Sequence, residues 1–386
     1  MALTYRTAGE SHGPALFAVV EGLPAGLPLT PEDIDVDLAR RQLGYGRGGR
    51  MKIERDRVQV KSGLRHGRTL GSPLTLEIPN LDWPNWERDR MAVWAPQEEV
   101  APVTLPRPGH ADLAGALKYG TRDVRPILER ASARETAARV AAGGVAKALL
   151  RRVGTEIRSH VVRIGPEAVE PRDDLVLEDF AGVDESPVRC LDPAVAEAMV
   201  AAIKAAGRDH DTLGGIFEVW AFDPLPGLGS HMSGDARLDG RLGQAVLGIQ
   251  AIKGVEIGAG FALGTLRGSV AHDEIHHGPE RGFYRRTNRS GGLEGGMTHG
   301  MPLVVRAVMK PISTLTRPLE SVDIVTREAR PAFKERSDVC AVPAAAVVGE
   351  AAVAFVLAQA LVEKFGGDSL GHLEAAVDRY REEIAR

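Results

Sequence analysis

The residue types best suited to acid–base chemistry and anion binding gather in one short stretch, residues 107–120. It places Arg107, His110 and Asp112 within six positions and then turns small and apolar. The Pro-Gly pair inside it predicts a bend, so that the histidine projects from a turn. Asp112 is predicted to cap a short helix that stops at Gly120, and a helix start attracts anions. Taken alone, the stretch is most simply a capped turn with a surface histidine.

Two further polar clusters lie in or next to turns, at residues 10–13 and 334–338. The glycine beside His12 allows that histidine to approach a ligand closely. Asp338 follows Arg336 at the edge of an apolar run. A carboxylate near a cation stays ionised and can accept a proton, so Asp338 is a candidate base. A structural ion pair at a helix entrance explains the same pattern, and both interpretations stay open.

Arginine far outnumbers lysine and is clustered, although the net charge is −4 and gives no support to a general nucleic-acid binder. The planar guanidinium suits bidentate binding of phosphate and carboxylate. A GC-rich or heat-adapted composition would also raise the arginine count, but it would not place so many in glycine-rich loops. The clusters are Arg40, Arg41, Arg47 and Arg50; Arg122, Arg125, Arg130 and Arg134; and Arg281, Arg285, Arg286 and Arg289.

Three familiar motifs are excluded or disfavoured. The glycines of residues 258–264 miss the dinucleotide-binding GxGxxG spacing by one position, and the chain contains no GxxxxGK[ST]. Residues 272–277 place two histidines at i and i+4, but Asp follows the first, and Gly-Pro ends any helix directly after the segment. A solvated histidine-rich loop therefore explains the segment better than a metal site.

The composition is that of a soluble globular protein: 386 residues, 44% hydrophobic and 26% charged, enough for a large core. Cys190 and Cys340 lie far apart without metal-binding spacing, which favours a reducing compartment. The first residues lack an apolar signal segment, and no uninterrupted apolar run approaches ~18 residues. We therefore expect a cytoplasmic protein with no membrane or nucleic-acid partner and no bound metal.

Hydrophobic periodicity predicts one α+β domain over residues 1–386, with sheets packed around central helices. The helix expected from residue 132 has a face of small residues, which suggests that this helix is buried between other layers of the fold. Residues 81–107 are expected to form a long ordered loop, and the polar, glycine-rich residues 272–301 a functional one. Strands are expected over residues 5–21 (interrupted), 52–60, 71–78, 156–166, 215–222 and 303–309, an extended segment over 255–266, and helices over 31–43, 132–152, 192–206, 238–253, 343–364 and from 369.

Six motifs, in this order, resemble the signature motifs of the chorismate synthase family: residues 9–13, 107–112, 130–136, 291–296, 310–314 and 336–338. Together they span nearly the whole chain. One departure is Thr212, where relatives usually carry serine, and the exchange keeps the hydroxyl. The resemblance implies a β-α-β sandwich with central helices between antiparallel sheets.

The resemblance also implies an activity, the last common step of the shikimate pathway towards the aromatic amino acids. Enzymes of this family are lyases that convert 5-enolpyruvylshikimate-3-phosphate to chorismate by anti 1,4-elimination of phosphate. They require reduced FMN without net redox change. Two carboxylates and a phosphate on the substrate, and another phosphate on FMN, explain a need for arginine.

By the family pattern, His12 is the general acid for the phosphate, His110 serves the flavin near N1, and Asp338 accepts the flavin N5 proton. The resemblance implies that the anionic groups of the substrate are bound by Arg50, Arg107 and Arg134. FMN contacts are implied for Arg130, Ala131, Ser132, Gln250, Ala251, Gly295, Lys310, Pro311, Ile312, Ser313, Thr314 and Arg336.

Arg41 and Arg47 match positions that are assigned to NADPH in relatives, where NADPH would be an indirect reductant. From their chemistry alone, the two arginines could equally well bind the phosphate or a carboxylate of the substrate. A homotetramer and a separate flavin reductase are further implications of the resemblance. Two rival hypotheses remain: a flavin-dependent oxidoreductase acting on a phosphorylated carboxylate, and a non-catalytic FMN- or anion-binding protein.

Overall fold

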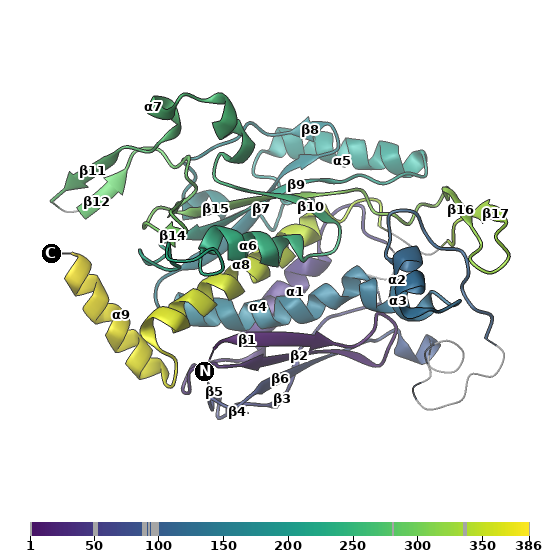
Figure 1. Ribbon diagram of the computed structural model, residues 1–386, viewed down its shortest axis with the longest axis horizontal. Helices are drawn as coiled ribbons and strands as arrows, with labels where there is room; N and C mark the ends of the chain where they lie inside the picture. The colour runs from purple at the N-terminus through teal and green to yellow at the C-terminus, as the bar shows by residue number, and fades with distance from the viewer. Residues whose placement is uncertain are drawn as a thin grey trace.

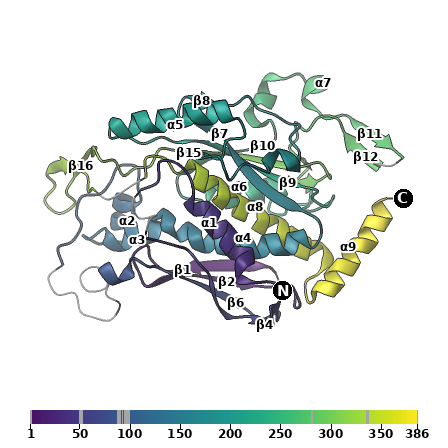
Figure 2. The same cartoon turned by 180° about the vertical axis from the view of Figure 1, so that it is seen from behind.

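The computed structural model describes residues 2–48, 53–86, 91, 93, 100–279, 282–334 and 338–385. In it, a layer of helices lies between two antiparallel sheets (Figures 1 and 2). This arrangement confirms the α+β fold with central helices that the sequence predicts.

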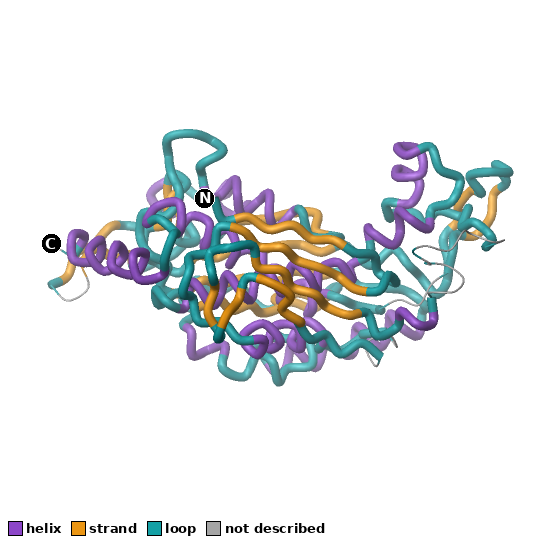
Figure 3. Tube along the Cα trace, turned by 90° about the horizontal axis from the view of Figure 1, so that it is seen from below, coloured by secondary structure: helices purple, strands orange, loops and turns teal. Residues whose placement is uncertain are grey.

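The smaller of the two sheets has four strands, and its outer face is seen directly in Figure 3. Its inward side chains follow a period of two, with Leu74, Leu76 and Ile78 buried against the helices. In spatial order the strands are β1 (Thr4–Ala8), β2 (Ala15–Glu21), β6 (Leu74–Pro79) and β3 (Gln59–Ser62).

The five-stranded sheet is covered on both faces along its central strand. The inner face packs on the helices, and on the outer face Phe180 contacts Trp220 and Phe222. In spatial order the strands are β10 (Ile252–Ile257), β15 (Leu303–Met309), β9 (Gly215–Phe222), β7 (Glu156–Ile164) and β8 (Glu167–Ala168). The predicted bounds of β9 and β15 are confirmed.

The central layer contains α1 (Pro31–Gln42), α4 (Thr136–Arg151), α6 (Leu238–Leu247) and α8 (Val342–Phe365). A Cβ at Gly143 would lie only 2.2 Å from that of Ala351, so the small face of α4 is what lets α8 approach. By length and composition α8 would cross a membrane, but 89% of its most hydrophobic window is buried in the protein, as in a core helix.

The remaining elements surround these layers. Helices are α2 (Asp112–Tyr119), α3 (Arg125–Ala131), α5 (Pro193–Arg208), α7 (Gly268–Ala271) and α9 (Leu370–Ile384), with 3-10 turns η2 (Trp83–Asn85), η3 (Ala133–Glu135), η4 (Leu177–Phe180) and η5 (Gly260–Thr265). Two-stranded hairpins are β4 (Leu64–Arg65) with β5 (Arg68–Thr69), β11 (Ile275–Gly278) with β12 (Gly282–Arg285), β13 (Leu293–Glu294) with β14 (Met297–Thr298), and β16 (Glu320–Val322) with β17 (Ala329–Pro331).

Four predictions of local structure were wrong in part. The helix expected over residues 238–253 ends at Leu247, and β10 begins at Ile252. The strand expected over residues 52–60 begins only at Gln59. Before this residue a side chain, and not a neighbouring strand, accepts the backbone hydrogen bond: the Val58 amide donates to the Asp35 carboxylate. The extended segment expected to residue 266 ends in η5, and the polar span 272–301 contains two hairpins.

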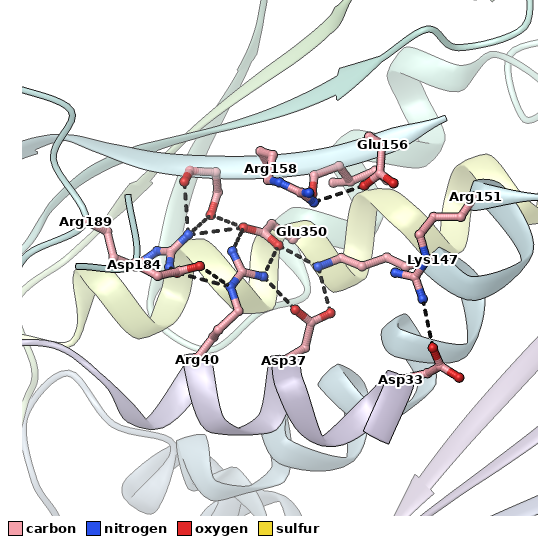
Figure 4. A network of polar contacts seen from close by, with 12 residues as sticks. Asp33, Asp37, Arg40, Lys147, Arg151, Glu156, Arg158, Asp184, Arg189 and Glu350 are labelled. Atoms are coloured by element: carbon pink, nitrogen blue, oxygen red, sulfur yellow. Dashed lines mark hydrogen bonds and ion pairs between the residues drawn. The ribbon is translucent and has the colours of Figure 1, made fainter. Parts of the chain in front are cut away.

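A fully buried carboxylate, Glu350, lies in the middle of α8 and accepts hydrogen bonds from four residues (Figure 4). Arg40 binds it in a bidentate manner at 2.7 and 2.8 Å. Lys147 and Ser159 donate at 2.5 Å each, and Arg189 at 3.3 Å. The contacts join α1, α4, α8 and β7.

The charges of this network balance. Asp37 accepts from Arg40 and Lys147, and Asp184 pairs with Arg40 and Arg189. Burial raises the pKa of Glu350, but Lys147 and Arg40 more than offset this and hold it well below the usual value. The carboxylate is therefore ionised inside the core.

Glu350→Gln should lower the free energy of unfolding by about 3–5 kcal/mol, because it leaves buried cations uncompensated. Urea denaturation measures the change. The matched control is Glu363→Gln, also on α8, whose carboxylate pairs with Arg241 at the surface; it should cost under about 1 kcal/mol. Equal effects of the two variants would contradict the role given to Glu350.

Candidate active site

Segments far apart in sequence meet in a cleft of about 1020 Å³. One wall comes from the loops before and within the α2–α3 region, and another from the turn between α6 and β10 together with the segment after β15. The first turns of α8 close the cleft from inside. The sequence-predicted residues that line it are His12, Arg41, Arg47, Arg107, His110, Ala131, Ser132, Arg134, Gln250, Ala251, Lys310, Pro311, Ile312, Ser313, Thr314 and Asp338.

Arg107, His110 and Asp112 form one hydrogen-bonded group. The turn is as predicted, with Gly109 at φ 78° and Gly120 in the left-handed conformation after α2. The Asp112 carboxylate accepts from Arg107 Nε at 2.8 Å and from the Arg107 backbone amide at 3.1 Å, and it also binds His110 Nδ1.

The prediction that Asp112 caps α2 was wrong. Ala111 occupies the cap position, and Asp112 is the first helical residue, 1% exposed. Burial raises the pKa of Asp112, but hydrogen bonds from His110 and Arg107 outweigh it and hold the pKa well below its usual value. The side chain is a buried counter-ion for the two cleft residues.

His12 is held by Glu129 of α3. The ring Nδ1 lies 3.0 Å from both carboxylate oxygens, and the His12 backbone amide donates to Oε2 at 2.8 Å. Trp86 stacks on the imidazole with centroids 3.7 Å apart. Arg125 lies 3.5 Å from Glu129 and above the Trp86 ring.

Arg41 and Arg134 share the buried carboxylate of Asp56, at 2.6 and 2.5 Å. Arg134 also donates to Asn80 at 2.9 Å. Burial raises the pKa of Asp56, but the two arginines lower it below the usual value; burial lowers the pKa of Arg41 to about 10. Arg134 also pairs with the buried carboxylate of Glu54 at 3.4 Å, so two carboxylates hold the two arginines in place.

Asp338 connects the segment before α8 to the glycine-rich loop after α1. Its Oδ1 accepts from the Gly48 amide at 2.5 Å, and its Oδ2 lies 3.3 Å from Arg47 Nε. Asp338 thus has an ion pair, with Arg47, and also lines the cleft. Arg50 and Arg336, two predicted site residues, lie outside the described residues.

Two other predicted contacts lie away from the cleft lining. Arg130 donates to the backbone oxygens of Gly9 and Thr7 at 2.8 and 3.0 Å. Gly295 sits in the turn between β13 and β14, against His231.

Gln250 and Ala251 show features typical of a binding site. Gln250 Nε2 donates to Glu135 at 3.0 Å, whereas its buried Oε1 has no hydrogen-bond partner among the residues described. Ala251 adopts φ 67°, a conformation that strains a residue with a Cβ. Nearby, Lys310 donates to the Gly109 carbonyl and Thr314 accepts from Arg107 at 3.0 Å.

Sequence reasoning missed the carboxylates that hold the cations, Asp56 and Glu129, and the stacking residue Trp86. Only weak signals were available: Glu129 is the one acid among the arginines of residues 125–134 before the capping box, and Trp86 belongs to a tryptophan-rich loop. Their partners are far away in sequence, so spacing alone could not identify them.

Cations, two carboxylate-held histidines and a strained backbone meet in one cleft, a combination typical of an enzyme active site. The family model for chorismate synthase matches residues 3–362. The chain therefore belongs to the chorismate synthase family.

The chain is also similar to individual members of the family along their whole length. The chain is 58% identical to the chorismate synthase of Moorella thermoacetica over 380 residues, covering 98% of each protein. It is 57% identical to that of Symbiobacterium thermophilum, covering all of both. A crystal structure of chorismate synthase superposes with a TM-score of 0.82 at 41% identity, covering 100% of this chain and 99% of that one.

Asp112→Ala should lower both stability and kcat/KM, the latter by at least about tenfold, because it releases Arg107 and His110. Chemical denaturation and steady-state kinetics measure the two effects. The control is Asp192→Ala. Asp192 is a true cap, whose side chain accepts from two amides of α5, so its loss should cost ~1 kcal/mol without a change in rate. Unchanged kinetics for Asp112→Ala would contradict its role as the counter-ion of Arg107 and His110.

Proposed function

We propose that this cleft is where the chain carries out the family reaction, elimination of phosphate from 5-enolpyruvylshikimate-3-phosphate to give chorismate. The observation that carries the proposal is the meeting of His12, His110 and Asp338 with the arginine side chains in one cleft. The ordered motifs that contain them lie up to about three hundred residues apart.

The cleft fits a flavin. The buried Gln250 Oε1, without a partner among the described residues, is an acceptor suited to an N–H group of the flavin ring. Ser132, at a helix start, and Lys310 suit its oxygens or phosphate. When bound, reduced FMN supplies electron density to the allylic system of the substrate, which promotes loss of phosphate.

The chain's own groups handle the protons and the charge. His12 would protonate or hydrogen-bond the departing phosphate. His110 would be the hydrogen-bonding partner of a bound flavin near N1, and Asp338 the acceptor for its N5 proton. Arg107 and Arg134 orient the substrate's anions, because each is already fixed by a buried carboxylate and needs little reorganisation to bind.

The remaining ligand residues are proposed on the family pattern. Arg50 is proposed as a substrate ligand, and Arg41 and Arg47 as ligands for anionic groups in the cleft. Flavin contacts are proposed for Arg130, Ala131, Ser132, Gln250, Ala251, Gly295, Lys310, Pro311, Ile312, Ser313, Thr314 and Arg336.

The family also supports a proposal about how the enzyme assembles and how it receives reduced flavin. We propose one domain over residues 1–386, a cytoplasmic homotetramer, and reduced flavin delivered by a separate reductase that draws on NADPH. The continuous hydrophobic core, which includes residues of both sheets and the central helices, supports the single domain.

Anaerobic mixing tests the function. Reduced FMN plus 5-enolpyruvylshikimate-3-phosphate should give many chorismates per flavin, with the flavin still reduced at the end. The rival oxidoreductase would consume one reduced flavin per product. A non-catalytic FMN- or anion-binding protein would change the flavin spectrum without forming chorismate.

Asp338→Asn should keep FMN and substrate binding while kcat falls by at least about tenfold, since the amide cannot accept the proton. The Asn oxygen can still accept from the Gly48 amide, which preserves the loop contact. Flavin titration and steady-state kinetics measure the two properties. Unchanged kcat would remove Asp338 from the proton path.

A further inference from the structure

We propose that Glu129 is a positioning residue for His12: it fixes the imidazole proton on Nδ1, so that His12 exchanges protons with the substrate through Nε2. The inference rests on the proposed acid role of His12 and adds the group that enables it.

The geometry ties His12 to Glu129 at two points. The backbone amide donates to Oε2 at 2.8 Å, and ring Nδ1 lies 3.0 Å from both Oε1 and Oε2. Glu129 is 1% exposed, whereas His12 lines the cleft. The carboxylate therefore lies behind the histidine and does not itself face the reacting atoms.

The chemistry of the pair decides the tautomer. An ionised carboxylate is an acceptor only, so a hydrogen bond to it requires Nδ1 to carry the proton. Nε2 is then the nitrogen that takes up or releases a proton during turnover.

The charges around the pair keep Glu129 ionised. Burial raises the pKa of Glu129, but hydrogen bonds from His12 and the Arg125 charge outweigh this and hold the pKa below its usual value. The other elements packed here contribute Trp86, which stacks on His12, and Asp82, which accepts from the Trp86 indole at 3.1 Å.

The ring is also restrained from the side. Trp86 stacks on it at an interplanar angle of 21°, and Arg125 lies 5.5 Å above the Trp86 ring. Arg125 pairs with Glu129 as well, so one arginine braces both the stacking residue and the carboxylate. A proton donor held in this way spends no free energy on reorientation in the transition state.

Glu129→Gln is the central test, because it keeps the shape and removes the charge. The amide oxygen can still accept from the His12 backbone, which turns the NH₂ group towards Nδ1 and places the ring proton on Nε2. We expect kcat to fall at least about tenfold, while the substrate KM and the FMN dissociation constant change less than about threefold.

A spectroscopic readout separates positioning from mere structure. In ¹⁵N-histidine-labelled protein, with the His12 signals assigned by their loss in His12→Gln, the wild type should show a protonated Nδ1. Glu129→Gln should show the neutral ring protonated at Nε2. A wild-type Nδ1 without a proton would overturn the inference, as would full kcat in Glu129→Gln.

The matched control is a second buried histidine–carboxylate pair away from the cleft. His160 Nε2 lies 3.0 Å from Glu218 on the five-stranded sheet, and Glu218 is also 1% exposed. Glu218→Gln should lower the midpoint of thermal unfolding and leave kcat unchanged. If it lowered kcat as much as Glu129→Gln does, the effect would be general destabilisation and the inference would fail.

Two further variants complete the design. Glu129→Asp keeps an acceptor-only carboxylate and should recover part of the kcat that is lost in Glu129→Gln. Equal losses of kcat in the two variants would contradict the tautomer argument. This comparison also holds if Glu129→Gln folds poorly. His12→Gln separates the role of His12 from the role of Glu129. Unchanged kcat in His12→Gln would overturn the acid role of His12 itself. A slow His12→Gln with a fast Glu129→Gln overturns only the role of Glu129.

Discussion

The fold depends on a carboxylate that has no access to water. Glu350 is acceptable inside α8 only because Arg40, Lys147 and Arg189 surround it. Those cations come from α1, α4 and the segment before α5, so neutralising one charge fixes several elements against each other. The consequence reaches the cleft, because Arg41 follows Arg40 on α1 and turns to Asp56.

The same rule recurs along the cleft wall, where buried carboxylates hold the groups proposed to act. Asp56 holds Arg41 and Arg134, Asp112 holds Arg107 and His110, and Glu129 holds His12 with Arg125. Each carboxylate serves two basic groups. The site is therefore preorganised, which is what electrostatic catalysis requires.

Much of the fold followed from local signals. Strong periodicity and clear stop residues gave β9 and β15 at their observed bounds and α8 to within a residue, and five of the six ordered motifs contribute residues to the lining of the cleft. Apart from errors in element bounds, the errors concern contacts between side chains. Partners 117 positions apart for His12 and Glu129, or 310 for Arg40 and Glu350, leave no trace in spacing. Asp112 was taken for a cap for a different reason: Arg107 and His110 are close to it in sequence, but spacing does not show that they bind its carboxylate.

A crystal structure of the protein with oxidised FMN and 5-enolpyruvylshikimate-3-phosphate would test the central claim, that this cleft binds both molecules. The account predicts the flavin ring against Ser132 and Gln250, with the substrate anions on Arg107 and Arg134. A second hollow of about 730 Å³ runs along α5, lined by residues such as Cys190 and Ala196. Flavin bound there, or anywhere else outside the arginine-lined cleft, would contradict the account.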